Sequence, residues 1–597
     1  MRGSFDERLV EGFRQELDYL RRAGADFARR YPKIASRLEL SEGESADPQI
    51  ERLLESFAFL TARIHNRLDA DFPEIPKALL DSLYPYLSEG IPPLAIARFD
   101  VGRDPLPPPD GRLITRGTPL YAQGAGATCR FRTTSELHLA PIALVDVRLE
   151  PVSLHDVFSS GRIAAVIRLR LKSLGVPLNE IRLDKLRLYL GGNRKLGPEL
   201  HELLVSAVGA IAWETAGNAG SPRPFARVAE VGFAANEAAL PERDNALSGY
   251  RLLAEYFAFQ EKFLFVDIEK LGPLPAATEA DLLIGLSRPP AGRFDLDAES
   301  VLLHCVPIVN LFVKTAEPIR LTHTASEYLV RPELNAEAQY EIHSVTDVLL
   351  SAASQPEPTR VAPYFGFGHA AVGDDAVFWH ARRVAARAGM PGTELHIGFK
   401  EQRFRARRPP GETVTVRTMC TNRALTEQLP TNAVLQADVE LPAAVSLQMR
   451  PTTCVHPPAD GATLWRLVSQ LSLSHIPYES GAEGLAALQE VLRLYCPPQR
   501  VSALEEIAGL RRLVAEPVVR RVGMESWRGF CRGVRLELEV DERAFVGGSA
   551  HLLGAVLSRF FAQTASINSF TELALRSAQR EGIWQQWPAT IGSRSTI

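Results

Sequence analysis

The opening of the chain carries apolar residues at helical spacing. Apolar or small residues recur three or four positions apart within residues 5–31, and charged residues occupy the other face: Phe13, Leu17, Leu20, Gly24, Phe27 and Tyr31. This spacing predicts a helix with one apolar stripe, similar to a heptad repeat. The stripe is shorter than the three to four heptads that would indicate a coiled coil, so spacing alone favours packing within this chain.

Two more helices are predicted before residue 85. Asp47 can cap free N–H groups and Pro48 suits the first helical position, so a helix should begin there. Its apolar stripe comprises Ile50, Leu53, Phe57, Leu60, Ile64 and Leu68. A shorter helix over residues 75–84 should end before Pro85. These helices are too few to close a core alone, so we expect them to pack against the rest of this chain or against other chains.

The pattern changes to short strands after a proline-dense stretch. We expect a linker or a turn-rich edge at Pro92-Pro93 and at Pro105 to Pro109 with Asp110-Gly111. Apolar runs and alternation predict strands within 113–120, 129–133, 163–171, 181–190, 263–266, 305–312, 341–348 and 414–420, with helices within 197–204 and 250–257. Residues 351–363 have the composition of a loop.

The last part of the chain mixes helices and strands. Helices are predicted over 464–473, over 485–495 and from Ser549 onward, and strands over 534–540 and 570–575. The fold class is therefore α+β and multidomain, with an N-terminal helical bundle segment, β-rich central domains and a C-terminal α/β domain. The expected domains are 1–95, 96–240, 241–460 and 461–597.

Composition narrows the class of protein. A chain of 597 residues suggests about four domains at roughly 150 residues each. Lysine and arginine total 67 against 71 acidic residues, so no positive excess points to nucleic acid or to an anionic membrane. The first residues lack the apolar core of a secretion signal, and no apolar run approaches the roughly 20 residues of a membrane span. We expect a cytoplasmic protein that meets a membrane only through partners.

Cysteine usage supports the same compartment. The six cysteines, at 129, 305, 420, 454, 496 and 531, are too far apart in sequence for a zinc-site spacing or a small disulfide framework. Six reduced thiols are typical of a cytosolic protein.

The sequence lacks the common local signatures of enzymes. The sequence has no phosphate-binding GxxxxGK[ST], no HExxH and no GxSxG. The glycines of 366–373 are misplaced for a dinucleotide fingerprint, and His304 and Cys305 are adjacent, which on a strand places them on opposite faces. The sequence therefore predicts no catalytic residue, no cofactor and no metal site. An enzyme or ligand-binding protein with a site assembled from distant positions remains an alternative.

A basic stretch at 382–408 has eight arginines and lysines but few aromatic residues. Single-strand nucleic-acid binders interleave basic and aromatic residues more regularly. A solvated face, or a contact with an acidic partner surface, is the favoured interpretation.

Several short stretches, taken in order, resemble one known family from end to end. They are ELDYLR at 16–21, FARRYP at 27–32, DPQIERLLESFAFL at 47–60, CRFRTT at 129–134, LLAEYFAF at 252–259, PIVNLF at 307–312, CTNR at 420–423, FCRG at 530–533 and NSF at 568–570. No single stretch is specific, but their order and number are. The chain resembles the TssF (VasA/ImpG) family, baseplate subunits of the bacterial type VI secretion system.

The resemblance implies a structural role in a contractile, phage-tail-like particle. Two TssF copies and one TssG would form a wedge, whose N-terminal helices wind into a shared bundle. Through the wedge, TssK, TssE and the spike protein VgrG would be further partners. The resemblance reverses the preference drawn from spacing and makes the apolar stripes an interface between chains, with these candidate residues: Phe13, Leu17, Leu20, Phe27, Tyr31, Phe57 and Leu60. A wedge protein of a related contractile particle is the alternative.

Overall fold

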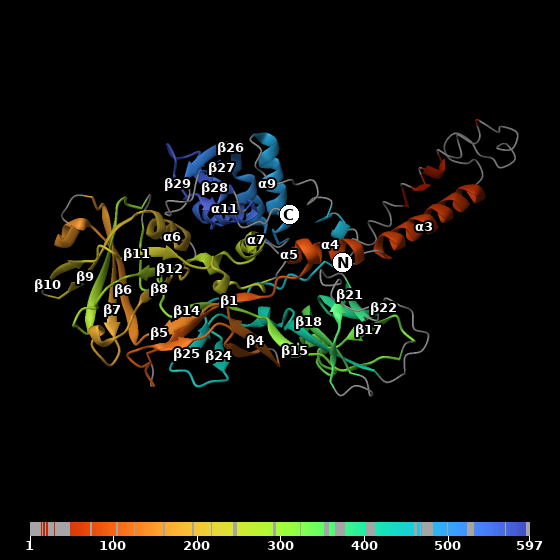
Figure 1. Cartoon of the computed structure of the whole chain (residues 1–597), viewed down its shortest axis with the longest axis horizontal. Helices are drawn as coiled ribbons and strands as arrows, with labels where there is room; N and C mark the ends of the chain where they lie inside the picture. The colour runs from red at the N-terminus through yellow and green to blue at the C-terminus, as the bar shows by residue number, and fades with distance from the viewer. Residues whose placement is uncertain are drawn as a thin grey trace. The chain divides into compact units, whose positions relative to one another are not determined.

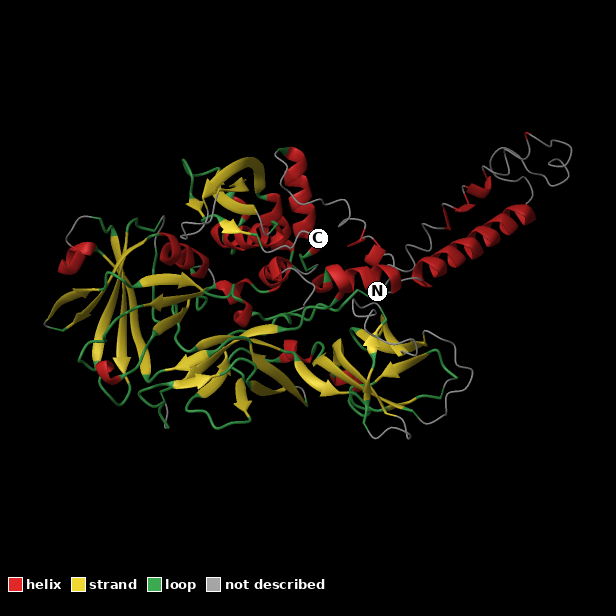
Figure 2. Ribbon diagram, in the orientation of Figure 1, coloured by secondary structure: helices red, strands yellow, loops and turns green. Residues whose placement is uncertain are grey.

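The computed structural model describes most of the chain in two compact units, Met1–Leu80 with Pro458–Val468 and Asp81–Pro457 with Ser469–Ile597 (Figure 1). The described residues are scattered positions within 13–29 and 463–468, together with 48–71, 74–102, 105–124, 126–158, 162–193, 196–216, 218–242, 248–290, 294–322, 324–351, 357–364, 377–387, 389–401, 412–458, 481–497, 500–521, 530–566 and 569–592. Mixed α+β structure in several sheets confirms the predicted fold class (Figure 2).

In the first unit, every described position up to Leu80 and within 463–468 is helical. Helix α3 runs over Pro48–Asp71, beginning at the proline as predicted, and α4 over Glu74–Leu83 starts in this unit. Positions described between 13 and 29 are also helical. Within the parts of the chain that the structure covers, no helix has both the length and the apolar character to cross a membrane.

A closed six-stranded barrel lies in the second unit. Its strand order is β1 (Leu94–Asp100), β14 (Cys305–Val309), β4 (Ala127–Thr133), β3 (Pro119–Gly124), β24 (Val434–Ala437) and β25 (Ala444–Leu447). The sequence predicted no strand at β1, which lies between the two proline groups that were expected to form a linker or a turn-rich edge. Prolines flank this strand rather than interrupt it, and five of its seven residues are buried. Proline density therefore marked the ends of a strand.

Two further sheets follow in the chain and share one core. One has the order β10 (Asn218–Pro222), β9 (Val208–Thr215), β13 (Glu279–Leu286), β7 (Ala165–Ser173) and β6 (Ile142–Glu150). The other has the order β11 (Arg227–Glu230), β12 (Phe265–Glu269) and β8 (Lys185–Tyr189). Helix α6 (Gly197–Ser206) contributes Leu200 and Leu204 to the core between them.

Residues 312–421 form two sheets that share another core. The first has the order β15 (Phe312–Thr315), β23 (Thr413–Thr421), β18 (Glu341–Ser351) and β19 (Thr359–Arg360), with β16 (Ile319–Arg320) also on β23. The second has the order β17 (Glu327–Val330), β22 (Thr393–Glu401), β21 (Val377–Ala385) and β20 (Ala362–Pro363). Residues 351–363 were predicted to be a loop. Their described part also contains short strand segments, namely the last residue of β18 and the two-residue strands β19 and β20.

The C-terminal part combines a sheet with three helices. Its strand order is β26 (Leu510–Arg521), β27 (Phe530–Val540), β28 (Ser569–Ser577) and β29 (Gln585–Gln586), with β30 (Thr590–Ile591) on β28. The helices are α9 (Ala482–Leu494), α10 (Val501–Ala508) and α11 (Ala550–Thr564). Helix α7 (Ser248–Ala258), from the middle of the chain, packs on α11, where the rings of Tyr250 and Phe560 lie 5.1 Å apart.

The expected domain limits stay a prediction. Strands β9 and β13 lie on opposite sides of the expected boundary at 240 and pair along six positions. The barrel likewise takes strands from 94–133, 305–309 and 434–447. Sheets in the second unit therefore combine stretches that are distant in sequence.

Candidate partner-binding surface

Helix α3 presents an exposed apolar stripe. Leu53, Phe57 and Leu60 follow one another at spacings of four and three, which places them on one face, and they are 65, 62 and 52 % exposed. Ala58 and Ala62, on another face, are 0 and 2 % exposed. Large side chains thus face outward while small ones are buried, the reverse of an ordinary core helix. An aligned set of this kind marks an interaction surface more often than a scattered exposed residue does.

The predicted interface residues are in part described. Phe13, Leu17 and Leu20 are helical and half-buried, and Phe57 and Leu60 are exposed. Phe27 and Tyr31 lie outside the described residues. The N-terminal segment contacts α3 through an ion pair, because Nε of Arg21 donates to a carboxylate oxygen of Glu51 at 3.0 Å.

Sequence reasoning missed other exposed apolar residues in this unit. Tyr19, Phe59 and Trp465 are between 44 and 67 % exposed. Tyr19, Phe59 and Trp465 were left out of the predicted stripes because a periodicity rule selects one face of a helix. The weak signal that could have found them is their size, since aromatic residues are enriched at interfaces.

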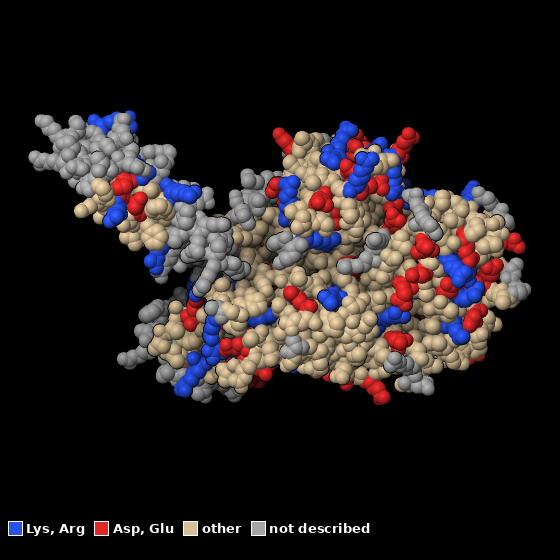
Figure 3. Space-filling model, turned by 180° about the vertical axis from the view of Figure 1, so that it is seen from behind, with Lys and Arg blue, Asp and Glu red and all other residues tan. Residues whose placement is uncertain are grey.

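Charges of both signs are mixed on the face of the molecule shown in Figure 3. Basic and acidic side chains are interspersed there, without a large field of one sign. Such a surface does not attract a polyanion at long range.

Two residues of the basic stretch make contacts within the fold, and the expectation of a solvated or partner-facing surface stays a prediction. Nε of Arg382 donates to Glu327 at 3.0 Å. Arg383 is buried and donates to the backbone oxygen of Ile342 at 2.6 Å. The alternating β21–β22 hairpin turns every second side chain inward, so a run of basic residues divides between two faces. Residues 402–411 lie outside the described part.

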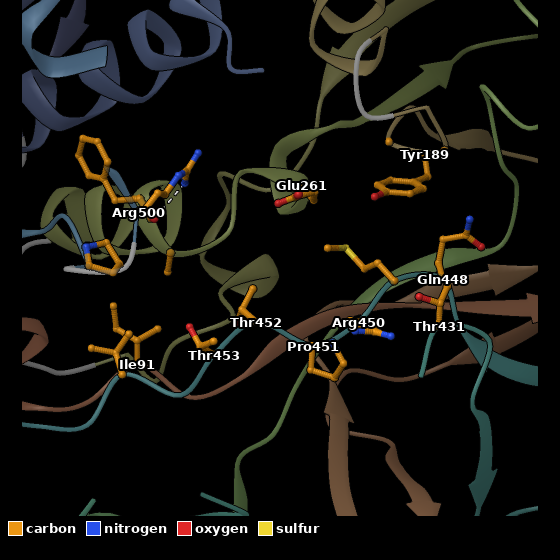
Figure 4. Close-up of a pocket in the computed structure, with 17 residues that line it drawn as sticks. Ile91, Tyr189, Glu261, Thr431, Gln448, Arg450, Pro451, Thr452, Thr453 and Arg500 are labelled. Atoms are coloured by element: carbon orange, nitrogen blue, oxygen red, sulfur yellow. Dashed lines mark hydrogen bonds between the residues drawn. The ribbon is translucent and has the colours of Figure 1, made fainter. Parts of the chain in front are cut away.

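The second unit contains a pocket of about 610 Å³, which is a candidate position for an enzyme site (Figure 4). Its charged residues are Glu261, Arg450 and Arg500, and their charged ends lie apart in the view. Arg500 is held by the end of α7, because its Nη1 donates to the backbone oxygens of Tyr256 and Phe257 at 3.0 and 2.9 Å. Charged groups that do not converge provide no acid–base pair for a reacting atom.

Of the adjacent pair His304 and Cys305, the cysteine is buried in β14 and the histidine is half-buried just before that strand. Burial lowers the pKa of His304 to about 4 and raises the pKa of the Cys305 thiol to about 12. A thiol that stays protonated is a poor nucleophile. All six cysteines are free.

The chain was compared with known proteins. The model of the family described as "Type VI secretion system, TssF" matches residues 5–594. The chain is 32% identical over 627 residues to the type VI secretion system component TssF1 of Pseudomonas aeruginosa strain PAO1, covering 99% of this chain and 100% of that protein.

Two solved structures are also similar. A chain of the TssK-TssF-TssG baseplate subcomplex matches with a TM-score of 0.73 and 26% identity, over 90% of this chain and 98% of that one. A chain of the baseplate complex from the type VI secretion system matches with a TM-score of 0.59 and 27% identity, over 98% of this chain and 100% of that one.

Proposed function

Because the chain belongs to the TssF family of the type VI secretion system, we propose that it is a structural subunit of that system's baseplate. The observation that carries the proposal is the match along almost the whole chain, together with similarity to a chain solved in complex with TssK and TssG. A subunit of this kind acts by holding neighbours in place, not by catalysis. The separated charges of the pocket are consistent with that role.

The wedge is proposed to contain two copies of this chain and one TssG. The exposed stripe of Leu53, Phe57 and Leu60 supports it, because burying large side chains against partner helices is worth about 1.5–3 kcal/mol each. Their spacing of four and three also suits a seam between helices. Phe13, Leu17, Leu20, Phe27 and Tyr31 are proposed to complete that seam.

The remaining partners are proposed to be reached through the wedge. They are TssK, TssE and the spike protein VgrG, and the assembly would dock at the inner membrane from the cytoplasm through other subunits. A wedge protein of a related contractile particle is the second candidate. Neighbouring genes separate the two, since a membrane complex and TssK-like adaptors belong to the secretion system.

The test is co-expression of this chain with the TssG of the same gene cluster, followed by mass measurement by light scattering on a sizing column. We expect a stable complex with two copies of this chain per TssG. A monomer that ignores TssG would overturn the proposal.

A paired substitution locates the interface. We expect Phe57→Asp with Leu60→Asp to abolish co-purification with TssG while circular dichroism of the chain stays unchanged. The matched control is Phe225→Asp, because Phe225 is 80 % exposed but lies in the second unit. Survival of the complex in the double variant would remove α3 from the interface. Loss of the complex in the control would show that the effect is not specific to α3.

A further inference from the structure

A glutamate, a cysteine and a histidine from two distant stretches meet at the start of strand β18. Glu341 is the first residue of that strand, and Cys454 and His456 follow strand β25. Their potential ligand atoms all lie within 4.8 Å of one another. Nδ1 of His456 is 2.6 Å from Oε2 of Glu341 and 3.9 Å from Sγ of Cys454. One ring nitrogen therefore faces both the carboxylate and the thiol.

This arrangement does not suit a nucleophilic cysteine. A catalytic histidine uses one ring nitrogen for the thiol and the other for the acid, so that a proton can pass between them. Here both neighbours approach Nδ1. Burial, with the charges of Glu341 and Glu427, also holds the pKa of the Cys454 thiol well above its usual range.

We propose that Glu341, Cys454 and His456 bind one zinc ion. Thiolate, imidazole and carboxylate are the ligands that zinc takes in proteins, at about 2.3, 2.0 and 2.1 Å respectively. Tetrahedral angles at those lengths separate the ligand atoms by about 3.3–3.6 Å. The Sγ–Nδ1 distance of 3.9 Å is close to that value, while the Oε2–Nδ1 distance of 2.6 Å must widen. His456 can move because its side chain is 25 % exposed.

Neighbouring residues orient the carboxylate for this role. The backbone N–H and the hydroxyl of Thr393 donate to Oε1 of Glu341 at 2.8 and 2.7 Å. These bonds leave Oε2 turned toward His456, as an outer partner of a metal ligand does. Gly392 has φ +93°, and a methyl group there would lie 2.6 Å from Oε2 and 2.8 Å from Nδ1. The absence of that side chain keeps the space between the ligand atoms open.

The charge around the cluster accommodates a dication. Arg383 and Arg423 are buried nearby, but their guanidinium groups donate to backbone oxygens, including that of Tyr340 at 2.8 Å from Nε of Arg423. Glu341, Glu427 and a Cys454 thiolate would supply three negative charges against these two positive ones. A zinc ion then leaves a single positive charge, which is close to balance. Zinc takes a fourth ligand, and water can serve as that ligand because the side chain of His456 is 25 % exposed.

An ion pair between Glu341 and protonated His456 is the competing interpretation, and the two differ in what they require of residues 454 and 456. Zinc needs the thiolate and an imidazole nitrogen. The ion pair needs only a cation at 456, so His456→Arg would keep it.

The experiment is titration of the full-length chain, in complex with TssG if that is how it purifies, with Co²⁺ and then Zn²⁺. We expect one Co²⁺ per chain with a thiolate-to-cobalt charge-transfer band in the near ultraviolet, displaced by Zn²⁺. Cys454→Ser should remove the band, and His456→Arg should weaken zinc binding by at least about 100-fold while the melting temperature of the metal-free chain stays unchanged. Thr393→Val, which removes an outer partner, should weaken binding by about 10–100-fold. Cys531→Ser on β27 is the matched control.

Absence of the charge-transfer band in the unaltered chain would overturn the proposal without any variant. Equal zinc affinity in Cys454→Ser and Cys531→Ser would overturn it as well. Neither result bears on the wedge, whose test is the mass of the complex with TssG.

Discussion

Two buried histidines face each other between helices α6 and α11. The rings of His201 and His551 have centroids 6.5 Å apart, and both side chains are fully buried. Their ring nitrogens have no hydrogen-bond partner among the described residues. Burial lowers the pKa of His201 to about 4 and lowers that of His551 as well, against the opposing charges of Glu230 on β11 and Glu202 on α6. Arg559 on α11 adds to the lowering at His201.

These histidines predict a loss of stability in mild acid. The unfolded chain binds a proton at His201 near pH 6.5, whereas the folded chain binds it only near pH 4. The folded state is therefore favoured above pH 6.5, and its advantage falls as the pH drops toward 4, by about 3 kcal/mol for this one residue. Urea denaturation at pH 7.5, 6 and 5 measures the change. His201→Gln should flatten the dependence between pH 6.5 and 5. An unchanged slope in that variant would show that His201 is not the group responsible.

Sequence reasoning could not foresee this pair. His201 and His551 are 350 positions apart and carry no spacing signal, and only the packing of α11 on α6 brings them together. The same holds for Glu341, Cys454 and His456, where the search for ligand spacing within short stretches predicted no metal site. Chemistry assembled by tertiary contact leaves no mark on local sequence.

At the level of single elements, the sequence predicted a feature correctly where one type of residue determines it. Pro48 begins α3, and the alternation over 534–540 corresponds to alternating burial in β27. Ser549 caps α11, because its hydroxyl accepts from the backbone N–H of Leu552 at 3.1 Å. Strand β1 and helix α10 were missed. The first lies between proline groups, and the second has only eight residues, too few for a periodic signal.

The cap on α11 gives a prediction for that element. Ser549→Ala should lower the free energy of unfolding by about 1 kcal/mol, because one N–H at the helix start loses its acceptor and the site is buried. Ser549→Gly should cost only a few tenths of that, since water and the flexible backbone can serve the N–H. Chemical denaturation of the two variants and the unaltered chain measures both. No loss of unfolding free energy in Ser549→Ala would mean that the hydroxyl is not the stabilising group.

At the scale of the whole molecule, distant stretches are joined by a buried pair of asparagines. The amide nitrogen of Asn310 donates to the side-chain oxygen of Asn422 at 2.8 Å, and the backbone N–H of Asn422 donates to the side-chain oxygen of Asn310 at 2.7 Å. Both amides also bind strand β4, where Asn310 donates to the backbone oxygen of Arg130 at 2.7 Å. The PIVNLF and CTNR stretches that carry the family resemblance therefore meet in space. Their sequences predicted a family but not this contact, because backbone partners of an amide have no sequence signature.

The hydrogen-bonded pair of Asn310 and Asn422 predicts how the second unit unfolds. The pair links β4 and the end of β14 in the barrel with the residue after β23. Asn422→Leu should therefore remove the acceptor of one Asn310 amide N–H and of the backbone N–H of Arg130. Each buried unsatisfied group costs about 1–3 kcal/mol, so a loss of about 2–6 kcal/mol follows. Because the loss falls on the connection and not inside either core, we expect calorimetry of the variant to resolve the barrel from the β15–β23–β18 sheet as separate transitions. The double variant Asn310→Leu with Asn422→Leu removes both amides and should lose less than the sum of the single changes. A single transition with additive losses would mean that the two parts are held together by apolar packing alone.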